Sequence, residues 1–112
     1  MNFFEKELDI TRNIRIIEWL KSQMLADVSS LFSLLVNGFK EEVHEHVSET
    51  LANLIIISYV LGKRLGTTYT AIQMKIDNKI KLGVIENTDI EKYYSDLSEL
   101  SKHFNKEKEG TG

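Results

Sequence analysis

"SETLANLIIISYVLGKRLG", residues 48–66, is the most apolar run in the chain, and it decides the fold. The residues that lead into its apolar part, 39–50, are charged but carry valines at helical spacing. From residue 51 onward the run is apolar on nearly all sides. Three successive isoleucines suit a strand, but the surrounding alanine and leucines and the unbroken length favour a helix. We therefore predict one helix that faces water at its start and is buried in its second half, within a bundle or a subunit interface.

The ends of the helices are predicted from glycine, because the chain contains no proline to interrupt them. Gly38, Gly66 and Gly83 each follow a segment with helical periodicity, as glycines at helix C-termini do. The starts are predicted from residues whose side chains cap free backbone N–H groups. The other helices are expected at residues 11–37 with Thr11 as N-cap, at 67–83 with Thr67 or Thr68 as N-cap, and at 88–104, where Thr88 and Glu91 form a capping box.

Four helices joined by short connections favour an all-α fold, an antiparallel four-helix bundle. A chain of 112 residues suffices for one hydrophobic core, so we expect a single domain, residues 1–106, and a disordered polar tail, residues 107–112. The apolar half of the second helix is buried either in a compact monomer or against a second copy of the chain in a symmetric interface. We favour the homodimer.

Composition limits the classes of partner. The hydrophobic fraction of 42% and the charged fraction of 28% are typical of soluble globular proteins, and a net charge of −3 gives no reason to expect binding to nucleic acid or to an anionic membrane. The longest uncharged stretch, residues 50–62, is too short to span a bilayer, and the acidic N-terminus does not resemble a signal peptide. Because cysteine is absent, disulfides and thiolate metal sites are excluded, and we expect a cytoplasmic protein.

One group of metal-ligating residues lies in the charged segment "EEVHEHVSE". Glu42, His46 and Glu49 are four and three residues apart, which places them on one helical face with Asn53 one turn further on. They could bind a divalent ion together. The alternative, which we favour on the residues alone, is a solvated charged face whose glutamates lie near the positive end of the helix.

A second constellation joins two helices. Asp27 and Ser30 are three residues apart on the first helix, and Thr50 and Asn53 are three apart where the second helix becomes apolar. In antiparallel neighbours the two pairs could meet at one level of the bundle and form a polar pocket. The alternative is a set of satisfied hydrogen bonds that fix the register of the helices, as buried amides often do.

Three phrases carry a resemblance to a known family: "LKSQMLADVSSLFSLLVNG", "ETLANLIIISYVLGKRLG" and "IQMKIDNKIKLG". In this order they resemble the MazG-like all-α nucleoside triphosphate pyrophosphohydrolases, over about residues 14–83, and the chain is closest to a short, degenerate subgroup. The resemblance implies helical dimers or tetramers in which Glu-x-x-Glu on one helix and Glu-x-x-Asp on the next hold Mg²⁺ against a nucleoside triphosphate. A lysine near an asparagine follows on a later helix.

Matched by position, the first acidic pair of the family falls on Asp27 and Ser30, the second on Thr50 and Asn53, and the lysine on Lys79. The chain departs from the pattern because only one of the four carboxylates remains. Mg²⁺ binds oxygen ligands with anionic compensation, and phosphoryl chemistry needs the metal to neutralise developing charge. The departure favours a degenerate metal site and a non-catalytic or weakly active protein with a role in binding or assembly.

The alternative is an active Mg²⁺-dependent pyrophosphohydrolase that acts on a nucleotide or a related pyrophosphate. In that case Asp27 and Glu49 would hold the metal, or Glu42 and His46 would replace them through a shifted register. The asparagine that follows the lysine in the family corresponds to Gly83 here. A third hypothesis is a four-helix bundle outside the family whose exposed face binds a partner helix.

Overall fold

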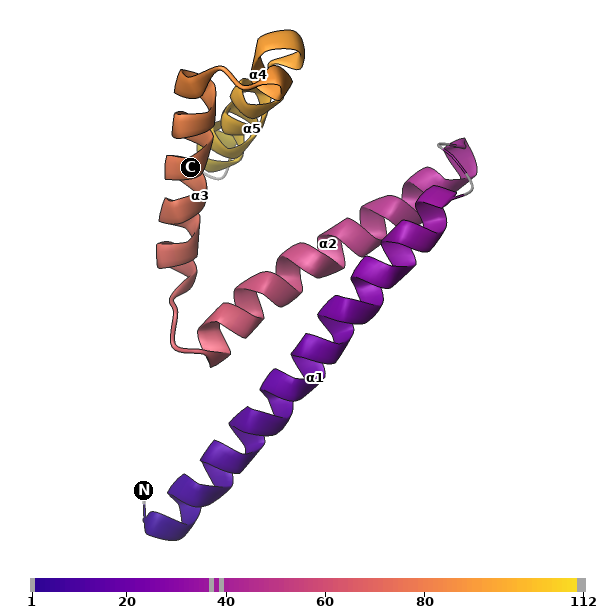
Figure 1. Ribbon diagram of the computed structural model, residues 1–112. Coiled ribbons are helices and arrows are strands. Elements are labelled where there is room, and N and C mark those ends of the chain that lie inside the picture. The colour runs from indigo at the N-terminus through magenta and orange to yellow at the C-terminus, as the bar shows by residue number, and fades with distance from the viewer. Residues whose placement is uncertain (1, 37, 39, 111–112) are drawn as a thin grey trace. The chain divides into compact units, whose positions relative to one another are not determined.

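The computed structural model describes residues 2–36, 38 and 40–110, with backbone alone for residues 107–110. The described residues form helices and no strand, so the predicted all-α class is confirmed. Contacts between residues divide the molecule into two compact units, Met1–Tyr69 and Thr70–Gly112. The expectation of one domain stays a prediction. The helices, labelled in Figure 1, are α1 (Phe3–Val36), α2 (Glu41–Arg64), α3 (Tyr69–Glu86), α4 (Asp89–Tyr94) and α5 (Asp96–Gly110).

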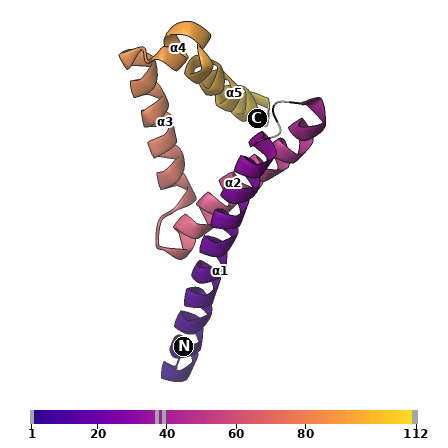
Figure 2. The same ribbon diagram turned by 45° about the vertical axis from the view of Figure 1, so that its right-hand side comes forward.

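The first unit is a hairpin of α1 and α2, which lie side by side in Figures 1 and 2 and run in opposite directions. The residues of α1 that face α2 recur at alternating spacings of four and three, and Leu20, 4% exposed, is the most buried of them. This spacing is that of a coiled-coil seam. The half-buried residues of the seam are Ile17, Met24, Asp27, Leu31 and Leu34 on α1 and Val43, Val47, Thr50, Leu54, Ile57 and Leu61 on α2.

Helix α1 begins earlier than predicted. The side chain of Asn2 caps it, because Oδ1 accepts a hydrogen bond of 2.9 Å from the backbone N–H of Glu5. Thr11 is not an N-cap: it lies inside the helix, and its hydroxyl donates to the carbonyl of Glu7 at 2.9 Å. A threonine hydroxyl can bond one turn back within a helix as well as cap one, so its residue type alone does not distinguish the two positions.

The turns after α1 and α2 agree with the prediction from glycine. Gly38 and Gly66 have φ values of +87° and +99°, a left-handed conformation that residues with a Cβ rarely adopt. The end of α2 is closed by the backbone N–H of Thr67, which donates to the carbonyl of Gly62 at 2.8 Å. At the same level the amide of Asn13 donates to the carbonyl of Arg64 at 3.2 Å and ties α1 to the end of α2.

Helix α3 begins directly after Thr68, but Gly83 does not end it. The helix continues to Glu86 and ends at Asn87, whose φ is +52°. The prediction for Gly83 is therefore wrong, and the reason is packing: the side chain of Leu97 lies so close that a Cβ on Gly83 would overlap it. This glycine allows close approach between two segments rather than a turn.

The predicted helix over residues 88–104 is divided at Ser95, whose φ is +56°. Glu91 does not close a capping box with Thr88. Its carboxylate instead accepts hydrogen bonds of 3.1 Å from the backbone N–H groups of Leu97 and Ser98, together with one from the Ser98 hydroxyl. Glu91, 9% exposed, thus caps the start of α5, because the break at Ser95 creates new free N–H groups there.

Helix α5 extends to Gly110, so residues 107–110 of the predicted disordered tail have helical backbone, and residues 111–112 lie outside the described part. In the ranges that the structure describes, no helix is both long enough and apolar enough to cross a membrane.

Candidate functional site

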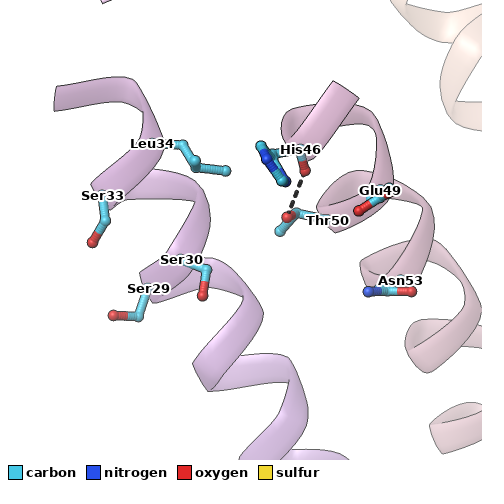
Figure 3. Close-up of a pocket in the computed structure, with 8 residues that line it drawn as sticks. All are labelled: Ser29, Ser30, Ser33, Leu34, His46, Glu49, Thr50 and Asn53. Carbon is cyan, nitrogen blue, oxygen red and sulfur yellow. Dashed lines mark hydrogen bonds between the residues drawn. The ribbon is translucent and has the colours of Figure 1, made fainter. Parts of the chain in front are cut away.

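A polar groove of about 580 Å³ lies between α1 and α2, near the turn that joins them. We call it the polar groove and define it by the eight residues drawn in Figure 3. They are Ser29, Ser30, Ser33 and Leu34 from α1, and His46, Glu49, Thr50 and Asn53 from α2.

Helical spacing brings these side chains to one place. On α2, His46, Thr50 and Asn53 are four and three residues apart and therefore share a face. Figure 3 shows His46 and Thr50 directed toward α1, while Ser30 is directed toward α2. The hydroxyl of Thr50 donates to the carbonyl of His46 at 2.8 Å, drawn as the dashed line, so this hydroxyl presents only lone pairs to the groove.

The structure brings together five of the residues singled out in the sequence. Ser30, Thr50 and Asn53, which match three of the family's acidic positions, all line the polar groove, and Glu49 and His46 line it with them. Of the four residues expected to meet at one level, Ser30, Thr50 and Asn53 line the polar groove and Asp27 does not.

Two other candidates of the first unit do not line the polar groove. Asp27 is half-buried one turn before Ser30, and Glu42 is exposed one turn before His46. Lys79 is exposed on α3, in the second unit. The family pattern correctly predicted that residues of the first two helices line the groove. Which residues of a helix face reach the groove depends on the helix that packs against that face.

Sequence reasoning missed Ser29, Ser33 and Leu34 as lining residues. A signal for Ser33 is present, because it follows Ser30 by one helical step of three, the spacing that already paired Asp27 with Ser30. Leu34 carries the same kind of signal, because it follows Ser30 by a helical step of four, whereas Ser29 lies directly beside Ser30 and carries none.

The chemistry of the polar groove is that of neutral donors and acceptors. Glu49 is its one carboxylate, and among the described residues of the first unit no lysine or arginine lines it. In the same part of the chain no group of three or more His, Cys, Asp or Glu residues is placed to hold a metal ion. One carboxylate with hydroxyls and an amide lacks the anionic oxygens that Mg²⁺ requires beside a triphosphate, so this donor set does not fit the metal that the family pattern implies.

Comparison with known proteins bears on the identity of the chain. A family model described as the MazG-like family matches residues 10–97. No curated protein and no solved structure gives a match. The matched region covers most of the chain and contains all of α2 and every residue that lines the polar groove. The chain therefore belongs to the MazG-like family.

Proposed function

We propose that this MazG-like protein is non-catalytic and acts by binding or assembly. The observation that carries the proposal is the donor set of the polar groove, in which Ser30, Thr50 and Asn53 stand where the family pattern has carboxylates. Each replacement keeps an oxygen that can bind through hydrogen bonds but removes a negative charge. The loss of three charges weakens binding of Mg²⁺ far more than it disturbs the packing of two helices.

The experiment that tests the proposal restores the lost charges. The variant Ser30→Glu, Thr50→Glu, Asn53→Asp is expected to bind Mg²⁺, measured by calorimetry, whereas the natural chain is not. The natural chain is also expected to release no pyrophosphate from standard or modified nucleoside triphosphates with Mg²⁺. Circular dichroism of the variant controls for loss of helix. Mg²⁺ binding of equal strength in the natural protein would contradict the proposal.

The second candidate is an active Mg²⁺-dependent nucleotide pyrophosphohydrolase, and the position of Glu49 favours it. Glu49 supplies a carboxylate next to the matched position Thr50, and His46 lies one turn away in the same groove. The same pyrophosphate assay separates the candidates. Turnover that requires Mg²⁺ and is lost in Glu49→Gln would establish the enzyme and remove the non-catalytic reading.

Assembly is proposed from the apolar surface that the first unit leaves uncovered. Ile55 and Ile56, in the apolar half of α2, are 60% and 59% exposed, and Leu25 and Phe32 on α1 are 73% and 63% exposed. A soluble chain rarely leaves so much apolar surface in water, since each fully buried side chain of this size stabilises by roughly 1.5–3 kcal/mol. We propose that a second copy of the chain covers this surface, in a homodimer formed through the apolar half of α2.

A further inference from the structure

We infer that the polar groove binds an uncharged ligand with a vicinal diol, the chemistry shared by the ribose of a nucleoside and by a free sugar, and that it does so without metal. This inference rests on the proposed non-catalytic function and names the ligand class of the same groove. It differs from the triphosphate and metal that the family pattern implies.

The charge of the groove selects against phosphate. A phosphate group needs cationic side chains, a helix N-terminus or a metal for compensation, and arginine or lysine is the usual partner. Glu49 contributes a negative charge, and in the first unit, as far as the structure describes it, neither a lysine nor an arginine lines the groove. A carboxylate repels phosphate but accepts two hydroxyl hydrogen bonds, which is how an acidic side chain holds the diol of a ribose in dinucleotide-binding proteins.

The hydrogen-bonding groups of the groove are available for such a ligand. Within the described part of the chain, the side chains of Ser30, Glu49 and Asn53 make no hydrogen bond, whereas the Thr50 hydroxyl hydrogen is already used. Glu49 offers acceptors, Ser30 offers a donor and acceptors, and the amide of Asn53 offers both kinds. Figure 3 places these groups around one opening, Ser30 from α1 and the other two from α2.

The size of the groove also fits. Its volume of about 580 Å³ lies inside the range of roughly 300–1,000 Å³ that small-molecule pockets occupy. Leu34 adds one apolar contact surface at the α1 side, against which the face of a sugar ring or a nucleobase can pack. The groove therefore combines a diol acceptor, neutral donors and one apolar wall.

The test is a titration of the full chain, followed by calorimetry and by the shift of the Asn53 side-chain amide in NMR. Three probes are compared without metal: adenosine, 2′-deoxyadenosine and methyl glucoside. A fourth is ATP with Mg²⁺. Adenosine or methyl glucoside is expected to bind, and which of them does so identifies the source of the diol. Deoxyadenosine is expected to bind about tenfold more weakly than adenosine, because one hydrogen bond to a charged acceptor is lost.

Matched variants locate the binding. Glu49→Gln is expected to weaken the binding about tenfold through loss of the charged acceptor. Glu45→Gln, which removes the same charge from an exposed position of α2 outside the groove, is expected to leave it unchanged.

The inference is overturned if neither adenosine nor methyl glucoside binds at millimolar concentration, if adenosine binds and deoxyadenosine binds as well as it does, or if the two variants weaken binding equally. Failure of the inference is distinct from failure of the proposed function. An absence of ligand binding together with an absence of turnover removes only the diol ligand. Tight binding and cleavage of ATP with Mg²⁺ removes both.

Discussion

At the scale of single residues, two polar side chains have roles that their residue types leave open. Asn53 lies in the most apolar run of the chain, and it faces the polar groove rather than the seam of the hairpin. Glu91 has the position of a capping-box residue for α4 but caps α5 instead. In both cases the packing around the side chain, and not its residue type, determines where the polar group points.

The capping role of Glu91 predicts a dependence on pH. The hydrogen bond from the Ser98 hydroxyl, aided by the N–H groups of Ser98 and Leu97 and opposed by burial, holds the pKa of Glu91 below its ordinary value of 4.5. The stabilisation is therefore fully present above pH 4.5 and is lost as the pH falls through the lower pKa of the folded chain. The amide shifts of Leu97 and Ser98 in NMR are expected to change together in acid.

The control for this prediction is Glu91→Gln, which is expected to shift the Leu97 and Ser98 amides at neutral pH and to remove their response to acid. If the two amides respond to acid in that variant as they do in the natural chain, another group is responsible.

At the scale of elements, Gly83 shows how a glycine inside a helix differs from one at its end. In an exposed helix interior, replacing glycine with alanine stabilises by about 1 kcal/mol. Here a Cβ would overlap Leu97 of α5, so the packing term opposes the helix propensity of alanine. The sign of the change in stability caused by Gly83→Ala therefore shows whether α5 packs on α3 through this contact.

We predict that Gly83→Ala lowers the free energy of unfolding of the second unit by at most about 1 kcal/mol, the low end of the usual cost of overpacking, because the overlapping atom is the terminal Cδ1 methyl of Leu97, which can turn aside. The measurement is hydrogen exchange of the α3 and α5 amides. Leu97→Ala opens space at the same point, so adding Gly83→Ala to it is expected to be neutral or stabilising. A stabilising effect of Gly83→Ala in the natural background would show that a Cβ at position 83 does not meet the side chain of Leu97.

At the scale of the whole molecule, the main feature is the shortage of buried apolar side chains. Among the described hydrophobic residues only Leu20 and Ile80 are buried, at 4% and 7% exposure, while Trp19, Ile55 and other large side chains stay largely exposed. Folding must offset a conformational entropy cost of roughly 1–2 kcal/mol per residue. Each unit, taken by itself, buries few large apolar side chains, and the proposed homodimer starts from this exposure in the first unit.

The homodimer predicts a solution mass of twice 12.9 kDa, measured by light scattering on a sizing column. Ile55→Glu places a charge in the proposed interface and is expected to shift the mass to that of one chain, because an unpaired buried charge costs several kcal/mol. Ser22→Glu, at an exposed polar position of α1, serves as the control and is expected to leave the dimer intact. A monomer in the natural chain would remove the dimer proposal.

The amino-acid sequence by itself determined the all-α class, the course of α2, the turns at Gly38 and Gly66, and the MazG-like resemblance that the family match confirms. These features depend on apolar spacing and on backbone conformation at single residues, and both are local. The same local reading placed Ser30, Thr50 and Asn53 at one level of two helices.

Only the tertiary structure decided the rest. The role of Gly83 depends on Leu97, the role of Glu91 depends on the break at Ser95, and the membership of Ser29 in the polar groove depends on the opening between α1 and α2. A periodic pattern states which face of a helix a side chain occupies, but not which distant segment faces it. Packing between segments far apart in sequence supplies that information, and hydrogen bonds and van der Waals contacts act only over those short distances in space.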